Sequence, residues 1–142
     1  MKKEQENKIL EMKEADIIAK LKGEYEMPTA TVIIDTLGIP VTLKGLTRKE
    51  MDKERNRSKQ GKNKEVNGAI YDANVVIKAT TNFDWGAAKP ENYSTTAEFV
   101  VRKLPAGVLS ALANKVLELS GYGDELEEEE EIKNSSEEAE EE

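Results

Sequence analysis

The sequence has no cysteine and no histidine among its 142 residues, and aromatic residues make up only 5% of it. The chain therefore has no thiolate nucleophile, no disulfide, no imidazole to carry protons near neutral pH, and neither of the commonest transition-metal ligands. Carboxylates, lysine and tyrosine remain as acid–base groups, and each would need a strongly shifted pKa to work at neutral pH. We expect a protein that is not an enzyme and that has no metal or cofactor.

Long apolar runs are also absent. The longest, such as residues 32–34 and 75–77, have three residues, which is far too short to span a bilayer. The charged segment 1–8 is not followed by the apolar stretch of a secretory signal. We therefore expect no membrane partner and a protein that works in the compartment where it is made.

Charge is distributed unevenly along the chain. The net charge is −8, but residues 124–142 carry 12 acidic residues and one lysine, so this segment has −11 and residues 1–123 have +3. The segment has too few apolar side chains to offset the entropy of ordering it. We predict a disordered acidic tail at 124–142, which keeps the protein soluble or covers a basic surface until a ligand arrives.

The N-terminal segment, 1–27, has the spacing of an amphipathic helix. Over residues 9–21, Leu10, Ile17 and Leu21 fall on one stripe of a single predicted helix. Such a helix either docks on its own core or packs against a partner or another subunit.

Residues 28–123 are predicted to form a small α+β domain that is mainly helical and has one β-hairpin. Two β-branched runs flank a turn at Gly38 and predict the hairpin at 29–44. Thr47 and Glu50 have the spacing of a capping box, and Thr95 and Glu98 repeat it, so each pair marks a helix start. Pro105 suits the first turn of a further helix, which Ser120-Gly121 ends. The predicted helices cover about 47–59, 65–80, 95–103 and 105–120.

Two other features are candidates for binding. Phe83 and Trp85 lie in a predicted loop, where aromatic residues plug the edge of a core or anchor a partner; the plug is favoured. The seam of the last helix is typical of core but also suits a subunit contact. The candidate partner-binding residues are Leu10, Ile17, Leu21, Phe83, Trp85, Leu109, Leu112 and Val116.

Residues 44–64 carry a net charge of +6. This could meet phosphates, but the segment has no aromatic residue for base stacking and no glycine-rich loop. We expect no nucleic-acid partner, and keep as an alternative a small basic nucleic-acid-binding regulator whose acidic tail is autoinhibitory.

The order of these segments resembles that of the XkdN-like phage tail assembly chaperones, which occur in tailed phages and PBSX-type prophages of Gram-positive bacteria. The resemblance covers most of residues 1–123 and lies in their order and spacing. The segments that carry it are the short N-terminal helix, 41–51 at the end of the hairpin, 77–84, 98–107 and 116–122. The family pattern has no catalytic or metal-binding residues.

The resemblance implies a non-catalytic role in tail morphogenesis. Proteins of this kind are thought to bind the phage tape measure protein, keep it soluble and recruit tail tube protein around it. The implied location is the host bacterial cytoplasm, with the protein absent from the mature virion. A structural tail component is a further alternative, and homo-oligomerisation stays open. In similar systems a frameshift appends a second domain, which a protein sequence does not reveal.

Overall fold

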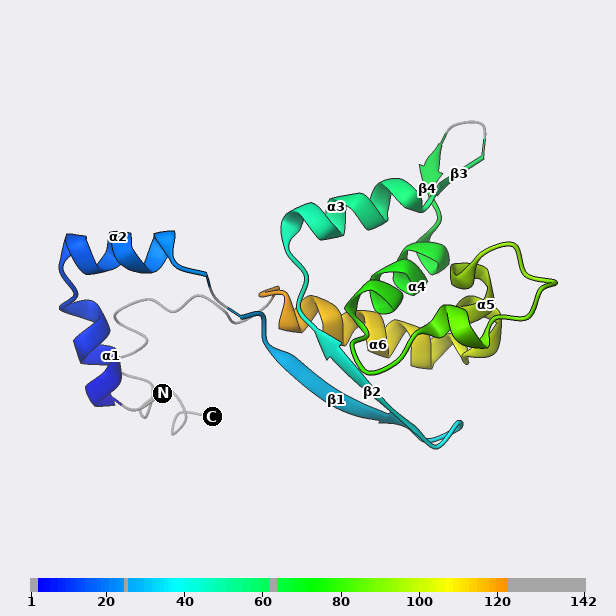
Figure 1. The fold of residues 1–142 in the computed structure, drawn as a ribbon, viewed down its shortest axis with the longest axis horizontal. Helices are drawn as coiled ribbons and strands as arrows, with labels where there is room; N and C mark the ends of the chain where they lie inside the picture. The colour runs from blue at the N-terminus through cyan, green and yellow to red at the C-terminus, as the bar shows by residue number, and fades with distance from the viewer. Residues whose placement is uncertain (1–2, 25, 62–63, 123–142) are drawn as a thin grey trace, which may run out of the picture. The chain divides into compact units, whose positions relative to one another are not determined.

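The computed structural model describes residues 3–24, 26–61 and 64–122 (Figure 1). The chain divides into two units, and each is described by itself. The N-terminal arm, Met1–Glu26, belongs to one unit, and the body, Met27–Gly123, is the other. The predicted disordered tail at 124–142 lies outside the described residues.

The N-terminal arm contains two short helices, α1 (Lys3–Leu10) and α2 (Glu14–Lys22). The prediction of one helix across residues 9–21 is wrong. Lys13 has an extended backbone with ψ 157°, and its side chain does not cap α2. The described part of neither helix buries a residue. Because short helices depend on tertiary packing, nothing here holds the turn between α1 and α2 in a helical conformation.

The predicted hairpin is present in the body as β1 (Thr29–Ile34) and β2 (Ile39–Lys44), with Ile34 opposite Ile39. Gly38 has φ +64°, a left-handed conformation that glycine adopts without a steric penalty. Side chains alternate between the two faces of the pair. Val41 and Leu43 are fully buried while Ile33 is 71% exposed, so one face of the hairpin covers the core and the other meets solvent.

Helix α3 (Arg48–Arg57) begins at the capping box that the sequence predicts. The backbone N–H of Glu50 donates to Thr47 Oγ1 at 3.2 Å, and the backbone N–H of Thr47 donates to Glu50 Oε1 at 3.1 Å. Each residue satisfies a donor that the helix itself leaves free. The start of this helix is therefore fixed by its own sequence.

A miniature hairpin, β3 (Lys59–Gln60) with β4 (Glu65–Val66), follows α3 and was not predicted. Strands of two residues are too short for a periodic pattern. Helix α4 (Gly68–Ala79) comes next, and the side chain of Asn67 caps it by accepting from the N–H of Ile70 at 3.0 Å. This cap places the helix start later than the predicted residue 65.

The chain then forms a 3₁₀ turn, η1 (Trp85–Ala88), and helix α5 (Thr96–Lys103). The second predicted capping box is only half formed. Thr95 Oγ1 accepts from the N–H of Glu98 at 3.1 Å, but the Glu98 carboxylate accepts from Ser94 Oγ at 3.0 Å instead of from the Thr95 N–H. The hydroxyl of the preceding residue competes successfully for the carboxylate.

Helix α6 (Ala106–Leu119) ends as the sequence predicts. Gly121 has φ +93°, and its N–H donates to the carbonyl of Glu118 at 3.2 Å. The N–H of Tyr122 donates to the carbonyl of Leu117 at 3.1 Å. These two bonds form a Schellman motif, which requires a left-handed residue at the glycine position.

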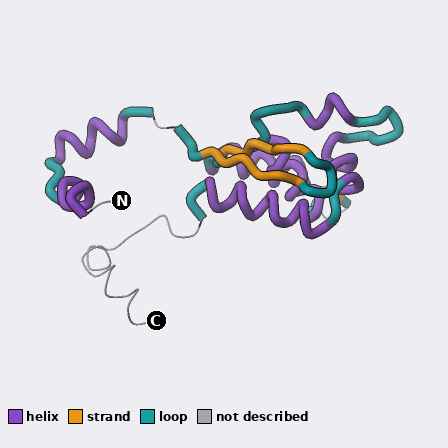
Figure 2. The backbone as a smooth tube through the Cα atoms, turned by 90° about the horizontal axis from the view of Figure 1, so that it is seen from below, coloured by secondary structure: helices purple, strands orange, loops and turns teal. Residues whose placement is uncertain are grey.

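The core lies between the hairpin and the helices. The inner face of the hairpin packs on α4 and α6, and α4 also contacts α3 and α5 (Figures 1 and 2). Helix α4 is buried on more than one side, because the consecutive residues 73–76 are all buried, and it therefore lies at the centre of the core. Its buried apolar residues are Ile34, Val41, Leu43, Leu46, Met51, Ala73, Val75, Val76, Ala79, Trp85, Ala97, Phe99, Val100, Leu104, Leu109, Leu112, Ala113 and Val116.

Two polar contacts join distant segments within the body. The N–H of Leu46 donates to Ser120 Oγ at 2.8 Å, and a Cβ at Gly45 would collide with the carbonyl of Leu119. Elsewhere, Asn74 Nδ2 on α4 donates to the buried Ser58 Oγ at the end of α3, at 2.9 Å. These contacts fix the two ends of α3 against α6 and α4. The structure thus confirms an α+β fold, mainly helical with the predicted hairpin.

Candidate partner-binding surfaces

The N-terminal arm carries a first group of exposed apolar side chains. Leu21 is 79% exposed, and Leu10 and Ile17 are 43% and 45% exposed. Ile17 and Leu21 are four residues apart on α2 and therefore share a face. Leu10 lies on α1, so the break between the helices interrupts the stripe that the sequence predicts. Ile9 and Ile18 are further exposed apolar residues here, at 48% and 41%.

Of the two loop aromatic residues, Trp85 fills the edge of the core and Phe83 is partly exposed. Trp85 is 4% exposed, and its indole N–H donates to Thr80 Oγ1 at 2.9 Å, so it plugs the core. Phe83 is 36% exposed, and its ring centroid lies 4.8 Å from that of Trp85. The Asp84 side chain between them accepts from the N–H of Gly86 at 2.9 Å and starts η1. Trp85 thus lies in the core, and Phe83 packs against it at the surface.

A cavity of about 380 Å³ opens beside Phe83. We call it the Phe83 groove. Its walls are mostly apolar, and among the described residues that line it Lys103 carries a positive charge. Aliphatic and aromatic walls with few polar groups suit an apolar side chain from a partner. The lining residues are Leu37, Ile39, Pro40, Asn82, Phe83, Trp85, Ala88, Phe99 and Lys103.

The seam of the last predicted helix belongs to the core. Leu109 and Leu112 are each 4% exposed, and Val116 is fully buried. Helix α6 packs against α4 and the hairpin. A partner has no free surface on these three side chains while the body is folded, so the core alternative for this seam is the one observed.

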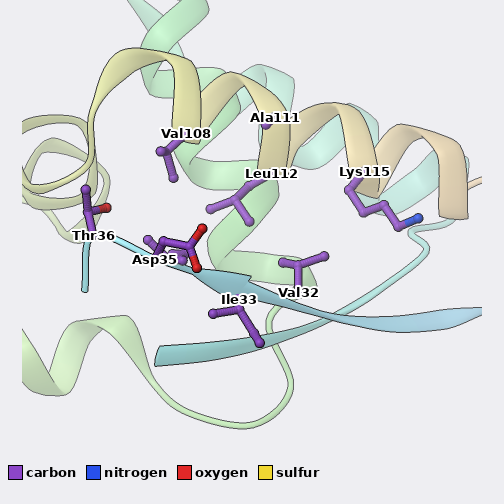
Figure 3. A pocket seen from close by; sticks show the side chains of 9 residues that line it. Val32, Ile33, Asp35, Thr36, Val108, Ala111, Leu112 and Lys115 are labelled. Carbon is purple, nitrogen blue, oxygen red and sulfur yellow. The ribbon is translucent and has the colours of Figure 1, made fainter. Parts of the chain in front are cut away.

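A second cavity, of about 350 Å³, lies between β1 and α6 (Figure 3). We call it the β1 groove. Val32 and Ile34 line it from the strand, and Val108, Ala111 and Leu112 line it from the helix. Asp35 lies near the Val108 end and Lys115 near the Val32 end (Figure 3). This groove was not predicted from the sequence, because its two walls are more than 70 residues apart in the chain and no local pattern connects them.

Two carboxyl groups have shifted acidity. The backbone N–H bond from Thr47 lowers the pKa of Glu50 and outweighs the opposing effect of partial burial, with smaller help from the Thr47 hydroxyl, Lys44 and Lys78. Burial raises the pKa of Asp72. Glu50 belongs to a helix cap and Asp72 to a helix face. Within the described ranges, no group of three or more acidic side chains is placed to hold a metal ion.

The basic segment around α3 is partly neutralised by its own neighbours. Arg57 lies 3.6 Å from the buried Glu54 carboxylate, and Lys78 of α4 lies 3.9 Å from that of Glu50. Arg55 stacks over the ring of Tyr71 at 5.9 Å. Part of the positive charge of this segment therefore takes part in contacts within the body.

The family model described as the phage XkdN-like tail assembly chaperone protein matches residues 9–133, which is most of the chain. No curated protein and no solved structure matches it. Among the described residues, no helix has the length and apolar character needed to cross a membrane.

Proposed function

Because the chain belongs to the XkdN-like family of phage tail assembly chaperones, we propose that it binds the tape measure protein and helps to recruit tail tube protein during tail assembly. The family match supports the assembly role, which is not catalytic. Binding of the tape measure protein and recruitment of tail tube protein are our inference, supported by the exposed surfaces. In it, the protein acts in the host bacterial cytoplasm and leaves before the virion is complete.

The observation that carries the proposal is the exposure of apolar side chains on α1 and α2. A tape measure protein is a long helical chain, and its apolar stripes would aggregate before the tail tube encloses them. A chaperone for it needs apolar surface to offer and enough charge to stay soluble. The arm supplies the apolar surface, and the net charge of −8 supplies the solubility.

The body supplies a second contact in this proposal. The Phe83 groove is open and apolar, and Phe83 itself is partly exposed. A leucine or methionine from one face of a helical partner would fill it, with Lys103 at the rim aiding encounter with an acidic segment. The buried Trp85 also lines the groove. The exposed residues Leu10, Ile17, Leu21 and Phe83 are therefore the proposed contacts.

Co-expression with the tape measure protein tests the proposal. Replacing Leu10, Ile17 and Leu21 together by Ser should reduce co-purification by about tenfold or more, since clustered apolar contacts dominate such interfaces. The matched control replaces three exposed polar residues on the same helices, Gln5, Asp16 and Lys20, by Ser. It changes no net charge and should leave co-purification unchanged.

A separate Phe83→Ser variant tests the groove. It should weaken co-purification while the body remains folded, because Phe83 is on the surface. If the unmodified protein fails to keep the tape measure protein soluble, the proposed function is wrong. If only the triple variant retains full binding, the arm is not the contact and the Phe83 groove becomes the principal one.

A further inference from the structure

The two outer edges of the β1–β2 hairpin differ in their hydrogen bonds to the rest of the body. At the outer edge of β2, the N–H of Thr42 donates to Asn82 Oδ1 at 3.0 Å, and Asn82 Nδ2 donates to the carbonyl of Pro40 at 3.0 Å. The N–H of Thr81 donates to the carbonyl of Thr42 at 2.9 Å. Pro40 itself has no N–H to leave unpaired. The outer edge of β2 is therefore closed.

The outer edge of β1 is open. In the observed register, and with the N–H of Gly45 donating to the carbonyl of Pro28, the residues that bond across to β2 are the even-numbered ones. The N–H and C=O groups of Thr29, Thr31 and Ile33 therefore point away from β2. No hydrogen bond from another described residue reaches these groups. The edge has the donors and acceptors needed for a further strand.

This open edge lacks the usual protection against pairing. Exposed edges are normally blunted by lysine, proline, a bulge or an inward-pointing charge. β1, with the sequence Thr-Ala-Thr-Val-Ile-Ile, has none of these, and its residues favour strand structure. Ile33, 71% exposed, adds apolar surface at the same edge. Both features are expected of an edge that is covered in the working protein.

The charges at the two ends of the β1 groove favour one arrangement of a second copy of the chain. Asp35 and Lys115 lie toward opposite ends of the groove (Figure 3). If β1 of a second copy runs antiparallel and is centred on Ile33, Asp35 lies opposite Thr31 of the second copy, toward the end where that copy carries Lys115. Two-fold symmetry then repeats the Asp35–Lys115 pairing on the other side. A parallel arrangement would place like charges side by side instead.

We propose that the open edge of β1 pairs antiparallel with β1 of a second copy, giving a two-fold symmetric dimer with a continuous four-stranded sheet. Val32 and Ile34 of each copy add to the apolar lining between the two α6 helices, and the Ile33 side chains meet at the axis. The dimer does not depend on the tape measure protein, so its test is separate from that of the proposed function.

The first experiment measures mass in solution. The full-length chain of 15.8 kDa should sediment as a dimer in analytical ultracentrifugation. Ile33→Lys places two like charges at the axis and should raise the dimer dissociation constant by about thirtyfold or more. Because Ile33 is exposed, its thermal transition should match that of unmodified monomer. A monomeric unmodified protein, or an Ile33→Lys variant that dimerises normally, overturns the proposal.

A charge exchange tests the antiparallel arrangement. Asp35→Lys alone and Lys115→Asp alone should each weaken self-association by about tenfold, since each sets like charges opposite one another twice. A mixture of these two variants should form heterodimers, because both cross-pairs are then of opposite sign. The matched control, Asp52→Lys on α3, should dimerise normally. Failure of the mixture to associate, with the single variants folded, overturns the assignment of this interface.

Discussion

Leu21 in the N-terminal arm and Leu109 in the body have the same side chain and both lie in short helices, but Leu21 is 79% exposed and Leu109 is 4% exposed. The difference holds for the two regions as a whole. The described part of the arm buries no helical residue, whereas every helix and the longer hairpin of the body contribute to one core. An amphipathic pattern is present in both regions. It therefore shows that a face is apolar and does not show what covers that face.

Three of the four α-helices of the body differ from α2 of the arm at their starts, while α6, which follows Pro105, has no side-chain cap either. In the body, α3, α4 and α5 each begin with a side chain that accepts a backbone N–H bond. In the arm, Lys13 precedes α2 at the cap position, and its side chain makes no cap hydrogen bond. Capped and packed helices are stable within the body, while an uncapped and unpacked helix is marginal alone. The described part of the arm thus has neither the side-chain caps nor the buried contacts that stabilise helices of the body.

The largest effect is expected from a cavity in the core. Leu109→Ala should lower the free energy of unfolding by about 2–5 kcal/mol, because it removes buried methyl groups and leaves a void next to α4. Chemical denaturation followed by circular dichroism measures it. A loss below 1 kcal/mol would mean that α6 is not held in the core as described.

A substitution at Gly45 should lower the free energy of unfolding by nearly as much. Gly45→Ala places a Cβ against the carbonyl of Leu119, so the end of α6 must shift, at a cost of about 3 kcal/mol. Gly68→Ala is the matched control, because a Cβ there meets no other atom within 4 Å. The control should be neutral or slightly stabilising in the same denaturation experiment. Equal effects of the two substitutions would contradict the close packing at Gly45.

Removing a helix cap should lower the free energy of unfolding by a smaller amount. Thr47→Ala removes the acceptor for the N–H of Glu50 and should cost about 1 kcal/mol. Lys13→Ala at the corresponding position of α2 should cost nothing measurable, since that side chain makes no cap bond. The pair of variants separates a helix start fixed by its cap from one that is not.

The pH dependence of stability should report the same cap. The pKa of folded Glu50 is lowered, so its stabilisation is complete above the pKa of the unfolded chain and is lost as the pH falls through the folded pKa. Glu50→Gln should therefore reduce the loss of stability on acidification from pH 5 to pH 3. Asp72 has the opposite sign, because its folded pKa is raised, and Asp72→Asn should help most at neutral pH. Thermal melting from pH 3 to neutral pH measures both variants.

The smallest effect is expected in the arm. Leu21→Ala should change the free energy of unfolding of the body by less than about 0.5 kcal/mol, because the side chain is exposed. The same deletion of methyl groups is then costly at Leu109 and neutral at Leu21. If Leu21→Ala destabilises the body by 2 kcal/mol, the arm is part of the core and its apolar residues are not available to a partner.

Local sequence determined the elements whose signals lie within a few residues of one another. The Thr47–Glu50 capping box, the turn at Gly38 and the left-handed Gly121 were all predictable, because each is set by hydrogen bonds or backbone conformation over three to six residues. The general fold class followed from the same signals. The half-formed box at Thr95 was not predictable, because Ser94 and Thr95 compete for one carboxylate and only the folded geometry decides between them.

Tertiary structure decided which apolar faces are free. The spacing of Leu109, Leu112 and Val116 is as regular as that of Ile17 and Leu21, but only the former meet α4 and become core. Tertiary structure also decided which edge of the hairpin is open. Thr81 and Asn82 lie against β2 and close its outer edge, while the outer edge of β1 is left open. The packing of α6 on α4 and the contacts of Thr81 and Asn82 with β2 join segments that are far apart in the chain, and no local pattern specifies such contacts.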